Sequence, residues 1–321
     1  LESLDDYITD AGINLADFNG ITDQVTVDGS LYELPFRSDY WLIYYNKDVF
    51  DAAGIAYPSN DMTMEDYDAL ARQLTDTTYG SQVYGCHYHT WRSAVELFGI
   101  LDGKHSILDG NYDWMIPYYD MILSEEDDGV CQTYTDLSTE GLHYSAAFSN
   151  GNVAMMNMGS WFISTLISNL DSGEYDSSLC GNWGIASYPH PDGAEAGSTI
   201  ATITGLAVTS ASANKDAAFD FVNWVSGTEG AKVMASTGNF PAIMTDDVIN
   251  TIAGMAGFPT DEGSKEALNI TNAYLEVPYA ENVSEINSIL DTYHTSIMNR
   301  EVTVEEGVAS MNEQVGKILN Q

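Results

Sequence analysis

The chain has 321 residues, of which 44% are hydrophobic and 18% charged, so it is long enough for one large core or two cores of ordinary domain size. Ten lysines and arginines stand against 48 aspartates and glutamates, which gives a formal net charge of −38. A chain this acidic repels phosphate backbones and anionic lipid, which disfavours nucleic-acid binding and adsorption to anionic membranes.

Aromatic residues make up 11% of the chain, which is too many for a disordered protein. No stretch is long and apolar enough to span a bilayer, and the polar, acidic residues 1–6 do not form a signal peptide. Because the chain starts at Leu1 without a methionine, we expect a fragment or a processed form.

An odd number of cysteines allows at most one internal disulfide and leaves one thiol over: Cys86, Cys131 and Cys180. Their spacing fits no zinc ribbon, and the expected state is a set of buried free thiols.

In chain order, residues 1–36 are expected to form loops and one short hairpin. Val25–Val27 and Leu31–Leu34 flank Asp28-Gly29, a dipeptide typical of hairpin turns. The first extended segment is expected to end at Leu34-Pro35.

The next elements are a buried strand and two helices. Tyr40–Tyr45 is an aromatic and branched run, which is the composition of a buried strand. A short helix is expected to begin near Val49 and to end at Gly54. A second helix follows Thr63, whose spacing to Asp66 predicts a capping box.

The middle of the chain predicts a helix at 141–151, a strand at 153–158 and a helix at 162–170. Short strands are then expected at 183–186 and 203–208. Towards the C-terminus, apolar residues at helical spacing predict four more helices, at 217–225, 228–238, 283–297 and 304–318. Thr303 and Glu306 are expected to form the capping box of the last helix.

Several segments, in this order, resemble the family 1 extracellular solute-binding proteins, the group similar to maltose-binding protein. The first match is Pro35 with Tyr45-Asn46-Lys47-Asp48, where such proteins pass from one lobe to the other. The second is Gly151, Ala154 and Met155 followed by Gly159-Ser160-Trp161. The third and longest runs from the glycine-containing strand at 203–208 to the proline of Phe240-Pro241-Ala242.

The resemblance implies an α/β fold with two lobes, similar to type II periplasmic binding proteins, in which a hinge joins discontinuous lobes. The first lobe would comprise residues 1–36 and 206–275, and the second residues 37–205 and 276–321. The strand–helix–strand unit that opens such proteins is not found at the front of this sequence. We therefore expect a first lobe that is unstable, rearranged or completed by another chain.

The function that the resemblance implies is capture of a carbohydrate, an oligosaccharide in our interpretation, for an ABC importer. The partners would be the sugar and the permease subunits, with no nucleic acid, no cofactor and no covalent chemistry. The protein would be a monomer outside the bacterial cell. It would be periplasmic, or a lipoprotein anchored through a segment that this chain does not include.

A sugar site needs aromatic faces for C–H groups and planar polar groups for hydroxyls. Trp161 is the strongest candidate, because the tryptophan of Gly-Ser-Trp often lines the cleft in the family. Other residues are chosen for their place at the lobe crossings or in the aromatic segment of the second lobe: Arg37, Asp39, Tyr40, Trp41, His89, Trp91, Thr204, Gly205, Asn239 and Phe240. A surface ion pair is the alternative interpretation of Arg37 and Asp39, and close backbone packing that of Gly205.

Other chemistries have weaker support. Cys86-His87-Tyr88-His89 places two histidines on one strand face, but no second cluster at ligand spacing accompanies it, so no metal site is expected. Two alternatives stay open for the function. One is the same fold binding a non-sugar solute, such as a polyamine or peptide. The other is an extracellular glycan-degrading enzyme, which would need two carboxylates flanking one bond.

Overall fold

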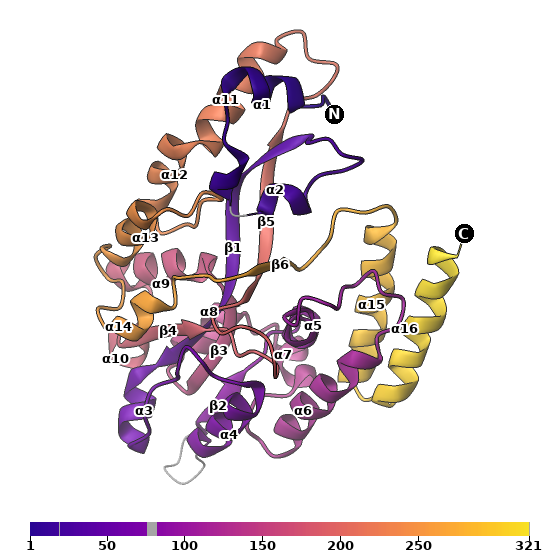
Figure 1. Ribbon diagram of the computed structural model, residues 1–321. Coiled ribbons are helices and arrows are strands. Elements are labelled where there is room, and N and C mark those ends of the chain that lie inside the picture. The colour runs from indigo at the N-terminus through magenta and orange to yellow at the C-terminus, as the bar shows by residue number, and fades with distance from the viewer. Residues whose placement is uncertain (19, 76–81, 321) are drawn as a thin grey trace.

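The computed structural model describes residues 1–18, 20–75 and 82–320. It shows two lobes joined by the long strands β1 (Glu33–Asn46) and β5 (Thr199–Ala207) (Figure 1). The expected lobe boundaries after residues 36 and 205 fall inside these two strands. The two-lobed α/β architecture expected from the sequence is confirmed.

The strand β1 belongs to both lobes. Its first part, from Glu33 to Tyr40, pairs antiparallel with β5. Its second part, from Trp41 to Asn46, pairs antiparallel with β3 (Val153–Gly159) and β4 (Trp183–Ser187). Parallel neighbours extend the two ends of the sheet: β2 (Tyr84–His87) lies beside β3, and β6 (Ala273–Leu275) lies beside β5.

Helices from residues 5–24 and 215–253, far apart in the sequence, lie around the first part of β1 in the first lobe (Figure 1). They are α1 (Asp5–Ala11), the 3₁₀ helix η1 (Leu15–Phe18), α2 (Ile21–Gln24), α11 (Lys215–Ser226), α12 (Thr228–Ala235) and α13 (Asp246–Ala253). The helix α14 (Glu262–Glu266) packs against β4 of the second lobe.

The second lobe contains α3 (Lys47–Ala53), α4 (Met64–Leu74), α5 (Ser93–Ile100), η2 (Asp113–Met115), α6 (Ile116–Asp127), α7 (Tyr134–Glu140), α8 (Tyr144–Ser149), α9 (Trp161–Ser172) and α10 (Ser177–Cys180). The C-terminal pair α15 (Val283–Met298) and α16 (Val304–Leu319) packs together beside α6 (Figure 1). No helix in the described ranges has the length and apolar character that crossing a membrane requires.

Local signals fix several of these helix ends. The expected capping boxes at Thr63 and Thr303 are both present, with Asp66 and Glu306 as the reciprocal partners. Gly54 ends α3 in the left-handed conformation with φ of 67°, as expected.

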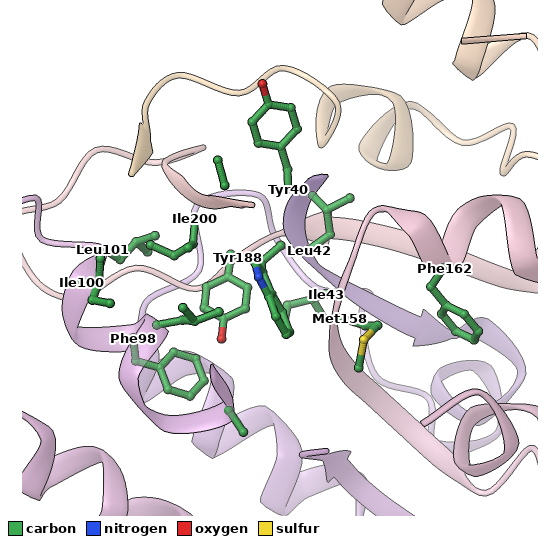
Figure 2. Close-up of a cluster of buried hydrophobic side chains, with 14 of the residues drawn as sticks. Tyr40, Leu42, Ile43, Phe98, Ile100, Leu101, Met158, Phe162, Tyr188 and Ile200 are labelled. Carbon is green, nitrogen blue, oxygen red and sulfur yellow. The ribbon is translucent and has the colours of Figure 1, made fainter. Parts of the chain in front are cut away.

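The core is continuous around the second part of β1, whose residues from Trp41 to Asn46 are all buried. Such complete burial is typical of a central strand covered on both faces by helices. Figure 2 shows this cluster, in which the rings of Phe98 of α5 and Tyr188 lie side by side, with centroids 5.2 Å apart. Tyr40 points away from Phe98 and Tyr188 in this view.

Three expectations for the first 50 residues are wrong. Residues 1–36 are not only loops and a hairpin, because α1, η1 and α2 lie there. Val25 follows the helix α2 rather than lying in a strand, and Val27 pairs only with Ser30 in an isolated bridge. The turn itself is present, because Asp28 and Gly29 both have positive φ, but Ile21 and Val25 are buried from a helical turn instead of a strand. The extended segment also does not end at Pro35, since β1 continues through it with a bulge between Pro35 and Arg37.

The first lobe covers part of the β1 edge with a loop. Ser38 N–H donates to the carbonyl of Phe240 (3.1 Å), and Ala242 N–H donates to that of Phe36 (3.0 Å).

Three large apolar side chains remain exposed on α11 and α12: Phe221, Trp224 and Val233.

Acidification is expected to destabilise the second lobe through His294. This side chain is buried in α15, where it packs on Tyr134, and its Nδ1 lies 3.0 Å from Tyr119 Oη. Burial, and then the nearby Arg92, lower the pKa of His294 from 6.5 to about 3. Below pH 6.5 the imidazole of His294 is protonated in the unfolded chain, but in the folded protein it stays neutral down to about pH 3. The free energy of unfolding therefore falls as the pH is lowered from 6.5 to about 3.

The measurement is urea unfolding at pH 7 and pH 5. Because the unfolded chain binds one more proton than the folded protein at pH 5, the free energy of unfolding is expected to be about 2 kcal/mol lower at pH 5 than at pH 7. A His294→Gln variant is expected to lose this share of the pH dependence. An unchanged pH dependence in the variant would contradict the prediction.

Candidate functional site

The hinge strands carry a polar stripe on one face. Arg37 lies opposite Thr204, and Asp39 lies opposite Thr202, in the antiparallel pair of β1 and β5. Residues that face each other across a ladder share a face, as do alternate residues along a strand. Trp41, two residues after Asp39, therefore continues this face towards the second lobe.

An aromatic cluster lies at the second-lobe end of this stripe. The ring centroid of Trp41 is 5.6 Å from that of Trp161 and 6.5 Å from that of Trp91. Tyr144 lies 5.7 Å from Trp91, and His89 lies 4.6 Å from the same ring, both edge-to-face. The structure thus brings together four of the predicted residues, which come from β1, α9 and the segment before α5.

The tryptophans differ in how much surface they offer. Trp91 is 40% exposed and Trp161 is half-buried, whereas Trp41 is 2% exposed. The rings of Trp91 and Trp161 are therefore accessible to a ligand, and Trp41 supports them from beneath.

Gly159 makes room for Trp161. A Cβ at this glycine would lie 2.0 Å from the Trp161 ring, and that contact is impossible without moving the indole. The Nε1 of Trp161 donates to the hydroxyl of Tyr144 at 3.1 Å, which holds the ring from its other side. The glycine of Gly-Ser-Trp thus leaves the space that the tryptophan ring occupies.

Ser160 joins the aromatic cluster to the polar stripe. Its N–H donates to the carbonyl of Tyr40 (2.8 Å), and its hydroxyl donates to Asp39 Oδ1 (3.2 Å). Arg37 also pairs with Asp39, at 2.7 Å between Nε and Oδ2. Burial raises the pKa of Asp39, and the attraction of Arg37 opposes this effect.

Glu276 is a central residue of the site that the sequence analysis missed. It follows β6 and accepts hydrogen bonds from Trp41 Nε1 (3.4 Å), Ser93 Oγ (2.7 Å) and Thr202 Oγ1 (2.9 Å). It therefore links the hinge strands, α5 and the aromatic cluster. Its place at the expected boundary between residues 206–275 of the first lobe and residues 276–321 of the second was the available signal.

A cavity of about 560 Å³ adjoins Glu276. It lies between β5 and the segment after β6, and its lining is largely apolar: Val27, Thr202, Ile203, Leu275, Glu276, Val277, Pro278, Tyr279 and Val283, among others. Tyr279 donates its hydroxyl to Glu33 Oε1 at 2.8 Å. Apolar walls with a few polar groups are typical of small-molecule sites.

The other predicted residues lie apart from the aromatic cluster. Tyr40 and Phe240 are buried on the opposite face of β1, with ring centroids 5.9 Å apart, and Tyr40 borders a second cavity of about 570 Å³. Asn239 donates to Thr237 Oγ1 (2.9 Å) within its own loop. A Cβ at Gly205 would lie 2.3 Å from the carboxylate of Glu33, which is a packing reason for glycine there.

Comparison with known proteins places this architecture in a family. The family model of bacterial extracellular solute-binding proteins matches residues 1–232. A solved structure of a sugar transporter from Rhizobium etli, in an open conformation, is 46% identical, with a TM-score of 0.92. The match covers 98% of this chain and 80% of that one.

Two more distant structures share the fold. An ABC substrate-binding protein from Listeria monocytogenes, solved with cycloalternan, is 22% identical with a TM-score of 0.81, and the match covers 100% of this chain and 80% of that one. The sugar-binding protein MalE from Xanthomonas citri is 19% identical with a TM-score of 0.74, at 100% and 79% coverage. No curated protein sequence matches the chain. This chain belongs to the bacterial extracellular solute-binding proteins, as its Gly-Ser-Trp and Tyr-Asn-Lys-Asp segments lead us to expect.

Proposed function

We propose that this protein captures a carbohydrate, an oligosaccharide, between its lobes and delivers it to the permease of an ABC importer. The observation that carries the proposal is the pairing of accessible tryptophan rings with hydrogen-bonding groups. Trp91 and Trp161 offer faces for the C–H groups of a sugar, and Glu276 and Thr202 beside them suit its hydroxyls. Sugar complexes among proteins of the same fold support this ligand class.

The mechanism we propose is hinge closure about β1 and β5. A ligand that contacts both lobes favours the closed arrangement by its additional contacts there, and no covalent step is needed. A monomer held outside the cell, free in a periplasm or anchored by lipid, fits this role. We assign the first lobe to residues 1–36 and 206–275, and the second to residues 37–205 and 276–321.

A polyamine is the second candidate, because the chain is acidic and carboxylates border the site. The contacts of these carboxylates favour sugar instead. Asp39 is paired with Arg37, and Glu276 accepts three hydrogen bonds from neutral donors, so at most one of these two carboxylates is left for the several cationic groups of a polyamine. A glycan-degrading enzyme would instead hydrolyse a chromogenic glycoside. Hydrolysis that is abolished by the substitution of one carboxylate residue would overturn our proposal.

A thermal-shift screen tests the ligand class. The panel contains mono- and oligosaccharides, with polyamines as the control. A ligand that binds only the folded protein adds about 2.7 kcal/mol of stability at one hundred times its dissociation constant. We expect one class of sugar to raise the melting temperature and polyamines to leave it unchanged. A rise with polyamines alone would overturn the carbohydrate assignment.

A further inference from the structure

Three buried groups that can bind a metal ion converge within the second lobe, apart from the residues proposed to bind sugar. Cys86 lies on β2, Glu125 lies near the end of α6, and Cys131 follows that helix. One ligand atom from each, the two Sγ atoms and a carboxylate oxygen, all lie within 4.8 Å of one another. All three cysteines of the chain are buried thiols, as expected, but Cys180 is not part of this group.

The backbone holds the three groups together. Val130 N–H donates to the carbonyl of Glu125 (2.8 Å), and Cys86 N–H points to the carbonyl of Val130 at 3.4 Å. Gly129 has φ of 71°, which lets the chain turn back after α6 and return Cys131 to the side of Glu125. The convergence is therefore built into the junction of β2 and α6 and does not depend on flexible side chains alone.

Glu125 is the group that needs a partner. Its side chain is 0% exposed, and neither carboxylate oxygen has a hydrogen-bond donor among the described residues. Burial raises the pKa of Glu125 to about 8 and also raises that of Cys86. Among the described residues, the buried hydroxyl of Tyr67 has no hydrogen-bond partner. The Tyr88 hydroxyl lies outside hydrogen-bond geometry but close enough to Cys86 and Glu125 to lower the pKa of each, against the effect of burial. A buried carboxylate without a donor is costly unless something compensates it.

We propose that Cys86 Sγ, Cys131 Sγ and the Glu125 carboxylate bind one thiophilic divalent cation of the zinc class. Two thiolates and a carboxylate are a ligand set that zinc takes in proteins, and a water or a neighbouring tyrosine hydroxyl completes four-coordination. Binding releases the two thiol protons, and the carboxyl proton where present, to solvent, with no change of oxidation state. The ion joins β2 to the end of α6 and gives Glu125 its missing partner.

Cobalt titration of the full chain tests this site. The protein is freed of metal with a chelator under reducing conditions and titrated with Co²⁺, and then with Zn²⁺ in competition. We expect one equivalent to produce a thiolate-to-cobalt charge-transfer band in the near ultraviolet, which Zn²⁺ removes. The band should fall by about tenfold or more in Cys131→Ser and remain in Cys180→Ser, the matched control. A band that survives Cys131→Ser, or no band in the native chain, overturns the proposal.

A second measurement avoids the risk that Cys131→Ser fails to fold. The unaltered protein is labelled with a thiol alkylating reagent, in the presence and absence of Zn²⁺, and the labelled residues are identified by mass spectrometry. Zinc should slow the labelling of Cys86 and Cys131 about tenfold or more relative to Cys180. Equal protection of all three thiols, or a Cys86–Cys131 disulfide in protein purified without reductant, would overturn the metal assignment.

Discussion

A Trp161→Ala variant is expected to bind the carbohydrate ligand about 10- to 100-fold more weakly, which corresponds to about 1.4–2.7 kcal/mol. The indole stands in contact distance of Trp41 and Trp91, and Tyr144 fixes it through Nε1. Its removal deletes an aromatic face and leaves the Tyr144 hydroxyl without this donor. Isothermal titration with the sugar identified by the thermal screen gives the affinity directly.

Trp224→Ala is the matched control for this prediction. It removes the same side chain from α11, where the tryptophan is 55% exposed and lies outside the aromatic cluster. We expect its sugar affinity to stay within about twofold of the unaltered protein, because an exposed side chain away from the site affects neither contacts nor packing there. Equal losses in the two variants would mean that Trp161 does not touch the ligand.

An Arg92→Met variant is expected to lose about 3–5 kcal/mol of unfolding free energy. Arg92 and its partner Glu96 are both buried at the start of α5, where they form an ion pair. Arg92 Nε also lies 2.9 Å from Asp291 Oδ1 of α15. Removal of the guanidinium leaves Glu96 charged and buried without its partner, which costs far more than the pair contributes. Urea unfolding at pH 7 measures the loss.

Two further variants distinguish this cause from a general loss of packing. Arg72→Met removes a partly exposed arginine that pairs with Asp68 and Asp128, and it should cost less than about 1 kcal/mol. The double variant Arg92→Met/Glu96→Leu should regain most of the stability, because no buried charge is then left alone. If the double variant is no more stable than Arg92→Met, the unpaired carboxylate is not the cause.

Local signals in the sequence were sufficient for many elements of this fold. The capping boxes at Thr63 and Thr303 and the end of α3 at Gly54 depend on residues within four positions of each other. The prediction of the first hairpin was wrong because it also used only local signals. Asp28-Gly29 does specify a turn, but whether Val25 lies in a strand or after a helix is decided by packing against distant parts of the chain.

The candidate site shows the same division. Trp161 and Trp91 were found from a motif and an aromatic segment, and the structure places them in one cluster. Glu276 was missed because its three donors, Trp41, Ser93 and Thr202, are each more than seventy residues away in the sequence. Only the folded hinge brings them to one carboxylate. The convergence of Cys86, Glu125 and Cys131 was invisible for the same reason.

The continuous strand β1 limits how new specificities can be engineered into this scaffold. Its 14 residues serve both lobes, so the insertion or deletion of one residue between Asp39 and Trp41 would turn one half of the strand over relative to the other. Ligand preference is therefore better altered outside the paired hinge strands, in segments beside the site such as residues 89–91 and 277–283. A library confined to those two segments would vary the chemistry of recognition and leave the pairing of β1 with β5 intact.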